Sequence, residues 1–377
     1  MSFGCECEIG IASSFAKMKQ ELGVWASFHD APISGTLELT PYCNLNCPMC
    51  YVHLDPIRAA KQGKHLTGKQ WLEIVRQAKD MGTLIVTMTG GEPFMHPDFW
   101  EIYEGIVTMG VLPIIYTNGC LIDEKVVERL KQYPPHNMKI SIYGASDATY
   151  ETMCGVKNGF TKLSRAIDLL KEADIRFYAT STVVHENAHD LVAMYQFAAE
   201  KRIPFNHTFA VTGTVRDAIS DPHSSRIGVN EMYFTLKGME KEMRPATDRP
   251  FAFCTGYGTS FNVSWHGRLG YCTFATKPYV QLTEPLDFAK AWKEMLEKTK
   301  AITVPAECAD CEWYMFCKRC PGLLCSESGE PDKVNPAFCK QAEEMYRIYL
   351  RLKAEEEAKA AEKTEEGAKD GTDPANQ

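Results

Sequence analysis

The sequence has no long hydrophobic run and no excess of positive charge. No stretch is long enough and free enough of charge to cross a membrane, and Glu6 and Glu8 stand where a signal peptide needs a basic start. We therefore expect a cytoplasmic protein. The formal net charge is −8, and half of it comes from the tail 353–377, so the rest of the chain offers no basic face for phosphates. Neither a nucleic-acid partner nor a membrane partner is expected.

Cysteine, in contrast, is abundant. Of the 377 residues 15 are cysteine, while 45% are hydrophobic and 24% are charged, a composition that supports a folded core and excludes a disordered or collagen-like chain. In a reducing compartment closely spaced thiols are typical of metal sites rather than of disulfides. The sequence therefore predicts a metalloprotein.

Between Thr36 and about Thr212 short β-branched runs alternate with amphipathic helical stretches. This alternation predicts an α/β fold of parallel strands, covered by helices and joined by right-handed crossovers. Six βα units could curl into a partial barrel or lie as an open sheet, and in both cases the ligand site belongs at the carboxyl ends of the strands. The expected strands are 36–40, 84–88, 112–116, 138–143, 177–184 and 205–211, and the expected helices begin near residues 67, 97, 123, 161 and 189.

The character of the chain changes after about residue 250. Apolar runs become shorter, and eight cysteines follow, which predicts a small, loop-rich domain held together by metal. A last helix is expected over 336–352, followed by an acidic tail that frays into solvent. The expected domains are an N-terminal extension 1–35, a barrel 36–240, a cysteine-rich domain 250–345 and a disordered tail 353–377.

Three cysteines follow the first expected strand. Cys43, Cys47 and Cys50 form the pattern Cys-x3-Cys-x2-Cys. Three thiolates can hold a [4Fe-4S] cluster and leave one iron open for another ligand. Zinc stays open as an alternative, because His53 lies three residues after Cys50 and would complete a Cys3His site.

The second expected strand ends in a glycine-rich turn next to this cysteine loop. The turn reads Thr89-Gly90-Gly91-Glu92-Pro93. Glycines let backbone groups approach a ligand closely, Glu92 offers a carboxylate, and Pro93 stops the turn from continuing as a helix. The turn alone is weak evidence, but its place one βα unit after the cysteines favours a cluster that binds a polar ligand.

Together these residues resemble the signature of radical S-adenosylmethionine (SAM) enzymes, Cys-x3-Cys-x-aromatic-Cys followed by Gly-Gly-Glu-Pro. The resemblance implies a six-stranded partial (β/α) barrel in which Cys43, Cys47 and Cys50 hold a [4Fe-4S] cluster. It also implies that the turn Gly90, Gly91, Glu92 and Pro93 receives the amino group of SAM. In this family the reduced cluster cleaves SAM to a 5′-deoxyadenosyl radical, which takes a hydrogen atom from the substrate. A flavodoxin-type or ferredoxin-type donor would supply the electron.

Other residues are assigned to the SAM site by the same resemblance. Met49 stands where relatives have an aromatic residue and can still pack against adenine. Many relatives carry an arginine shortly before the glycine that is Gly155 here, but this chain has Cys154, so the SAM carboxylate must find another partner. Polar residues at later strand ends are expected to face the ribose and the carboxylate, namely Thr117, Asn118, Ser141 and Thr182.

Two further residues are candidates for proton transfer at the mouth of the barrel. They are Tyr143, after the fourth strand, and His207, in the last strand. His207 is equally well interpreted as a hydrogen-bonded core residue. Likewise Thr117 could be an ordinary turn residue, and Cys154 a small buried side chain.

The cysteines after residue 250 resemble the SPASM extension of radical SAM enzymes that modify peptides and proteins. The central block of this chain reads Cys308-x2-Cys311-x5-Cys317-x2-Cys320. The SPASM pattern has the same first two gaps but three residues in the last one. By resemblance Cys308, Cys311, Cys317 and Cys339 bind one auxiliary [4Fe-4S] cluster, and Cys254, Cys272 and Cys320 bind a second. Cys325 could complete the second cluster, or an open iron could meet substrate there. Two zinc ribbons are the alternative, although the five-residue gap is atypical of them. Cys5 and Cys7 are expected to be reduced surface thiols.

The SPASM resemblance implies a ribosomal peptide or a protein side chain as substrate, with peptide maturation as the function. Residues 1–35 are too short for the peptide-recognition domain of many such enzymes, so a separate recognition protein is a possible partner. A small metabolite such as a tetrapyrrole precursor is an alternative substrate, and oxidation of a protein side chain, as in sulfatase maturation, is another possible reaction. An alternative from another class is a non-catalytic zinc or iron–sulfur electron-transfer protein.

Overall fold

Six parallel strands form the centre of the molecule. The structure, a computed structural model, describes residues 21–215, 217–228, 231–233, 258–317 and 321–369. The six strands lie side by side in the order of the chain, and each is parallel to the next. The predicted α/β fold is therefore confirmed. The strands are β1 (Ser34–Thr40), β2 (Ile85–Gly90), β3 (Leu112–Thr117), β4 (Asn137–Ser141), β5 (Phe177–Thr182) and β6 (Phe205–Thr208).

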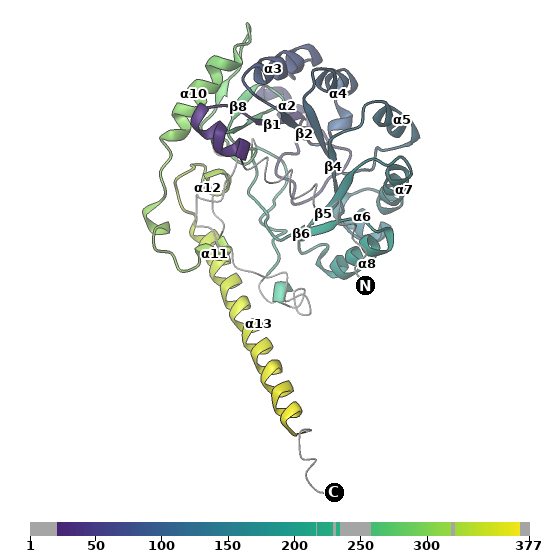
Figure 1. The fold of residues 1–377 in the computed structure, drawn as a ribbon, viewed down its shortest axis with the longest axis vertical. Coiled ribbons are helices and arrows are strands. Elements are labelled where there is room, and N and C mark those ends of the chain that lie inside the picture. Colours follow the sequence, from purple (N-terminus) through teal and green to yellow (C-terminus); the bar gives the residue numbers. More distant parts are fainter. Residues whose placement is uncertain (1–20, 216, 229–230, 234–257, 318–320, 370–377) are drawn as a thin grey trace.

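Helices cover one side of these strands and lie in an arc around it (Figure 1). The first long helix begins at a capping box, in which Thr67 and Gln70 exchange hydrogen bonds, and it buries Trp71, Ile74 and Val75 against the sheet. Each crossover helix ends before the next strand starts. These helices are α3 (Gly68–Asp80), α4 (Phe99–Thr108), α5 (Glu124–Gln132), α7 (Gly159–Glu172) and α8 (Leu191–Lys201).

Four short elements add to the expected pattern near the strand ends. The helices are α2 (Pro56–Gln62) and α6 (Asp147–Cys154), and the two single 3-10 turns are η1 (Pro93–Met95) and η2 (Ala188–Asp190). They lie in the segments that follow β1, β4, β2 and β5. Their length of three to eight residues gives too few apolar repeats for a periodic signal in the sequence.

The two faces of the sheet differ in chemistry. The face toward the helices is fully buried and mostly apolar, and it includes Val86, Met88, Ile115, Met138 and Ile140 at 0% exposure. The inner face is only partly buried and mixes polar side chains with apolar ones such as Ile85 and Ile114. It carries Thr87, Tyr116, Lys139, Ser141, Tyr178 and Thr180. The inner surface is therefore open to polar ligands.

Three strands extend the sheet beyond β1. Strand β7 (Ser260–Val263) pairs in parallel with β1, and the antiparallel strands β8 (Arg268–Gly270) and β9 (Val280–Gln281) complete a nine-stranded sheet. Gly35 in β1 allows this packing, because a Cβ there would lie 2.2 Å from the Phe261 ring. The sequence pattern did not predict these strands, whose two to four residues are too few to show alternation.

Helices follow the last strand. They are α10 (Phe288–Lys300), the 3-10 turn η4 (Ala306–Cys308), α11 (Tyr314–Cys317), α12 (Pro321–Ser328) and α13 (Pro336–Lys369). The expectation that the chain is a disordered tail from residue 353 is wrong for residues 353–369, which continue α13 as one helix (Figure 1). The segment is rich in good helix formers, and the pairs Arg347–Glu343, Arg351–Glu355 and Lys353–Glu357 support it at i,i+4 spacing.

Within the described residues, no helix combines the length and the hydrophobicity that a membrane span requires.

Candidate functional site

The cysteine loop and the glycine turn are packed directly against each other. The Gly91 amide donates to the Thr40 carbonyl at 2.7 Å, and the Glu92 amide donates to the Tyr42 carbonyl at 2.8 Å. A Cβ at Gly90 would lie 2.3 Å from the Thr40 oxygen, and one at Gly91 would lie 2.1 Å from the Tyr42 oxygen. The two glycines are therefore required because the start of the cysteine loop crosses over them.

Glu92 is fully buried between the ends of β2 and β3. Its carboxylate accepts hydrogen bonds from the Thr117 hydroxyl at 2.8 and 3.0 Å, from the Asn118 amide at 2.9 Å and from the Phe94 amide at 3.3 Å. Burial raises the pKa of Glu92 to about 7, although these hydrogen bonds act in the opposite direction. Glu92 thus joins two strand ends and holds a carboxyl group that titrates near neutral pH.

Asn118 connects the end of β3 with the cysteine loop. Its side-chain amide donates to the Asn44 side-chain oxygen at 2.8 Å and contacts the Cys43 sulfur at 3.6 Å. Thr117 and Asn118 were predicted to face SAM. In the structure the Thr117 hydroxyl is engaged with Glu92, and the Asn118 side chain positions the cysteine loop.

The three cysteines of the loop lie close to one another and away from bulk water. Burial raises the pKa of Cys50 to about 11, and burial together with the Glu92 carboxylate raises the pKa of Cys43. A buried thiol binds metal as a thiolate only when a cation compensates for its charge. The chemistry of the three thiols therefore fits a positively charged metal group at this loop.

A fourth cysteine, Cys154 at the end of α6, joins this group. Its sulfur lies 3.6 Å from that of Cys47, and its carbonyl accepts from the Asn46 amide at 2.8 Å. The Tyr143 side chain also hydrogen-bonds Cys47, so this candidate residue lies at the cysteine loop. Sequence reasoning could not predict that Cys154 approaches Cys47, since the two are 107 residues apart.

The segment after β6 covers the cysteine loop from another side. The Val215 amide donates to the Tyr51 carbonyl at 2.9 Å, and the Ser220 hydroxyl donates to the Cys50 carbonyl. The Ile219 amide donates to the carbonyl of His53 at 3.1 Å. Sequence reasoning did not identify this segment as part of the site.

The zinc alternative at the loop stays open. In the part of the chain that the structure describes, no three His, Cys, Asp or Glu side chains are grouped closely enough to hold a metal ion as they stand. This applies equally to Cys43, Cys47 and Cys50 alone and to the three with His53, so it does not distinguish the two interpretations.

His207 does not lie at the mouth. Its register partner in β5 is Ser181, which is 1% exposed on the helix-covered side, and its ring bonds the Tyr195 hydroxyl of α8 at 2.9 Å. The prediction that His207 faces the mouth is not met, because strand alternation turns it outward. The alternative interpretation as a core residue fits this position.

The remaining candidates are arranged as follows. Ser141 and Thr182 are the last residues of β4 and β5 and stand on the inner face. Met49 is buried within the main hydrophobic core.

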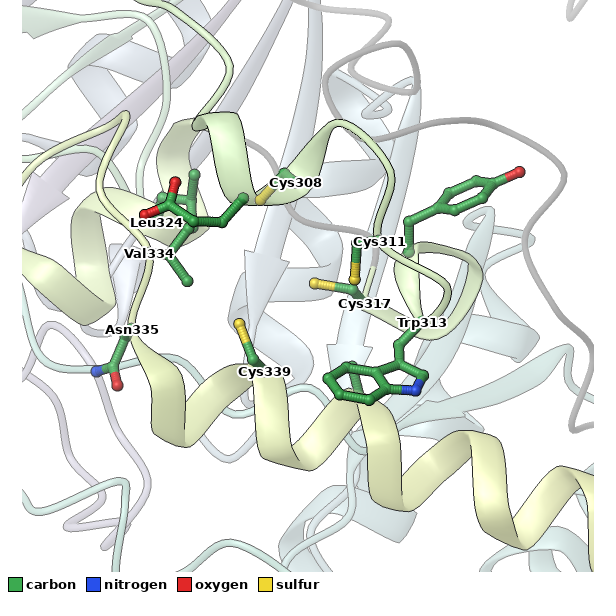
Figure 2. A pocket seen from close by; sticks show the side chains of 11 residues that line it. Cys308, Cys311, Trp313, Cys317, Leu324, Val334, Asn335 and Cys339 are labelled. Carbon is green, nitrogen blue, oxygen red and sulfur yellow. The ribbon is translucent and has the colours of Figure 1, made fainter.

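Four cysteines of the C-terminal region line one cavity. Cys308, Cys311 and Cys317 come from the segment η4 to α11, and Cys339 comes from the first turn of α13. Figure 2 shows these side chains around the space between that segment and α13. The space between these side chains, counted together with the solvent at its open side, is about 500 Å³, and its lining is mainly apolar.

Cys272 and Cys325 both lie at α12. A Cβ at Gly322 would lie 2.9 Å from the Cys272 sulfur, and Cys325 stands one helical turn further along α12. The Cys325 thiol is 3.4 Å from the Thr276 hydroxyl and 3.6 Å from the Lys277 carbonyl. Cys254, Cys320, Cys5 and Cys7 lie outside the described residues.

Comparison with known proteins gives consistent matches. The radical SAM superfamily model matches residues 37–198. An AdoMet-dependent heme synthase from Methanosarcina barkeri is 28% identical over 192 residues, 51% of this chain and 54% of that protein. A PqqA peptide cyclase from Granulibacter bethesdensis is 28% identical over 169 residues, 45% of this chain and 44% of that protein. The chain thus matches about half the length of these curated relatives.

A solved structure covers more of the chain. Streptococcus suis SuiB bound to S-adenosylmethionine has a TM-score of 0.62 at 17% identity, over 84% of this chain and 80% of that one. The same protein bound to the precursor peptide SuiA has a TM-score of 0.59. At this identity the match shows a common fold.

Proposed function

Because residues 37–198 form a radical SAM domain, we propose that the chain is a SAM-cleaving enzyme of peptide maturation, with Cys43, Cys47 and Cys50 as the cluster ligands. A bound [4Fe-4S] cluster would supply the electron that splits SAM into methionine and a 5′-deoxyadenosyl radical, which takes hydrogen from the substrate. The observation that carries the proposal is the packing of the three-cysteine loop on Gly90 and Gly91.

The residues around the loop would then divide the work of holding SAM. The turn Gly90 to Pro93 would receive the amino group, Met49 would pack against adenine, and Ser141 and Thr182 would bind polar atoms from the inner face. Glu92, fixed by Thr117 and Asn118, keeps the two strand ends in register. Tyr143, which bonds Cys47, is positioned to hold or move a proton beside the loop.

A peptide is the substrate that we favour. A relative named PqqA peptide cyclase matches the barrel, and a protein of the same fold has been solved with its precursor peptide SuiA. A tetrapyrrole precursor is the second candidate, because a relative named AdoMet-dependent heme synthase matches the chain at similar identity.

The C-terminal region would bind two auxiliary [4Fe-4S] clusters. The first is supported by the four cysteines that line one pocket, Cys308, Cys311, Cys317 and Cys339, since four thiolates are the usual ligands of such a cluster. Cys254, Cys272 and Cys320 would hold the second, with Cys325 as a possible fourth thiol.

We also propose a SPASM-type domain over 250–345, a flavodoxin-type or ferredoxin-type electron donor, a separate peptide-recognition protein and a reducing, cytoplasmic location.

The test uses protein that is purified and reconstituted without oxygen. Reduction with dithionite in the presence of SAM should yield 5′-deoxyadenosine, and iron analysis should find about twelve iron atoms per chain, four for each cluster. Replacement of Cys43, Cys47 and Cys50 by alanine should remove about a third of the iron and all of the cleavage. The matched control is Cys5→Ala with Cys7→Ala, which should retain both.

Cleavage by the triple variant would refute the assignment of the three cysteines. A colourless protein that contains zinc and forms no 5′-deoxyadenosine would refute the proposed enzyme class.

A further inference from the structure

A lysine stands on the inner face of the barrel below the strand ends. Lys139 in β4 is in register with Tyr116 of β3 and with Tyr178 of β5. Its neighbours Met138 and Ile140 are 0% exposed on the helix side, so alternation turns Lys139 inward. The three residues form one row across the inner face.

The positive charge of Lys139 has no partner of opposite sign in the described part of the chain. The ammonium nitrogen lies 4.8 Å from the centre of the Tyr116 ring, and the only cause that shifts its pKa is burial, which lowers it. The inner-face carboxylate of Glu38 stands on β1, three strands away from β4. A partly buried charge without a counterion raises the free energy of the folded protein, so binding of an anion beside Lys139 would be favourable.

Polar groups beside Lys139 suit the same anion. The Tyr178 side chain hydrogen-bonds that of Tyr116, so both hydroxyls lie in the row. Ser141 is the next inward residue of β4 and ends the strand at the candidate SAM site, about 7 Å further along. An extended lysine side chain is long enough to span that separation, and in the structure the Lys139 ammonium lies beside the Tyr116 ring, in the row below Ser141.

We propose that Lys139, with Tyr116 and Tyr178 beside it, binds a carboxylate inside the barrel. The inference rests on the proposed function, because that function supplies two carboxylates: the methionine carboxylate of SAM and an acidic group of a peptide substrate. In both cases Lys139 selects for negative charge at the reacting end of the ligand.

The first experiment measures how fast Lys139 is acylated by a succinimidyl ester in the cluster-loaded wild-type protein, with mass spectrometry of the labelled peptide. A bound carboxylate shields the amine and keeps it protonated. At a probe concentration of about ten times its dissociation constant, about a tenth of the sites stay free, so labelling slows about tenfold. Lysines on the outer helices, such as Lys125, report the unprotected rate.

Two matched pairs of probes distinguish the carboxylate of SAM from an acidic group of a peptide substrate. S-adenosylhomocysteine carries the methionine-like carboxylate, whereas 5′-methylthioadenosine lacks it. N-acetyl-glutamate amide carries a side-chain carboxylate, whereas N-acetyl-glutamine amide has none. Protection only by S-adenosylhomocysteine assigns Lys139 to the cosubstrate, and protection only by the glutamate compound assigns it to the peptide. Equal protection by both members of each pair, or by no probe, overturns the proposal.

A second measurement uses variants. Lys139→Met should weaken binding of the protecting carboxylate about ten- to a hundredfold and leave its uncharged counterpart unaffected, and Lys139→Arg should restore most of the affinity. Unchanged affinity for both carboxylate probes in Lys139→Met also overturns the proposal.

The outcome is separable from that of the proposed function. Protection of Lys139 needs no SAM cleavage, so a protein that forms 5′-deoxyadenosine while Lys139 stays unprotected keeps the function and loses this inference. A protein in which Lys139 is protected but SAM is never cleaved keeps this inference and loses the proposed function.

Discussion

At the scale of single residues, the site is organised by side chains that hold other parts of the site. Glu92 joins β2 to β3 through Thr117 and the Asn118 amide, and Asn118 in turn reaches Asn44 in the cysteine loop. These four residues form a continuous polar chain from one strand end to the next. The positions of the cysteines are thus set by hydrogen bonds before any metal is bound.

The titration of Glu92 should be visible in the stability of the cluster-free protein. The folded pKa is about 7, above the ordinary value of 4.5, so the folded state binds more protons than the unfolded state between these values. The free energy of unfolding should therefore fall by up to about 3 kcal/mol as the pH rises from 4.5 to 7. Urea unfolding of the wild type and of Glu92→Gln at several pH values measures the difference. A constant difference across this range would contradict the prediction.

Cys47 and Cys154 predict a second result. Their sulfurs are 3.6 Å apart, so small rotations of the two side chains bring them within bonding distance. Oxidised glutathione added to cluster-free protein should accept two electrons and two protons from this pair and leave a Cys47–Cys154 disulfide. Mass spectrometry of the digested protein identifies the crosslinked peptides. Cys154→Ser should lack them, and a dominant link between Cys47 and another cysteine would show that the pairing is wrong.

At the scale of elements, β7 attaches the C-terminal region to the barrel by pairing with β1. The contact between Gly35 and the Phe261 ring leaves no room for a side chain. The junction therefore depends on one residue without a Cβ.

Gly35→Ala should destabilise the protein by about 1–3 kcal/mol, because the added methyl group must displace the Phe261 ring. Thermal unfolding measures the loss. The matched control is Gly23→Ala, where the added carbon meets nothing within 4 Å and the melting temperature should stay the same or rise. Equal melting temperatures of Gly35→Ala and the wild type would show that Phe261 moves without cost.

At the scale of the whole molecule, Glu327 of α12 holds the C-terminal region against the segment after β6. Its buried carboxylate pairs with Arg226, accepts from the Gly213 amide at 3.0 Å and lies 3.4 Å from the His223 ring. The same segment covers the cysteine loop through Val215 and Ser220. One ion pair thus connects the two cysteine regions.

Glu327→Ala should cost about 3–5 kcal/mol, since it removes the buried carboxylate that pairs with the Arg226 guanidinium. Limited proteolysis should then cut within 211–226 sooner than in the wild type. Arg226→Ala serves as the companion variant, because it breaks the same pair from the other side. Unchanged proteolysis in both variants would exclude a role for the pair in docking.

The sequence predicted the features that depend on neighbouring residues and missed those that depend on contacts between distant segments. The six strands, their order and the meeting of the cysteine loop with the glycine turn followed from local periodicity and from the rule that parallel strands share one carboxyl edge. Contacts between distant segments carried no such signal: Cys154 beside Cys47, β7 beside β1, and the segment 211–220 over the cysteine loop. His207 was assigned to the mouth because strand parity depends on a register that composition does not fix.

Helix α13 contacts the rest of the protein along much of its first half, and two of these contacts lie far apart. Cys339 in its first turn lines the cysteine cavity, and further along Arg351 stacks on the Tyr233 ring while Glu355 accepts from the Tyr233 hydroxyl at 2.6 Å. The two attachment points are about 24 Å apart on one continuous helix. A helix is stiff along its axis, so a displacement of Cys339 would be carried to Arg351 and Glu355 and from there to Tyr233. Under the proposed assignment of Cys339 to a cluster, binding of that cluster would therefore act on the segment 231–233.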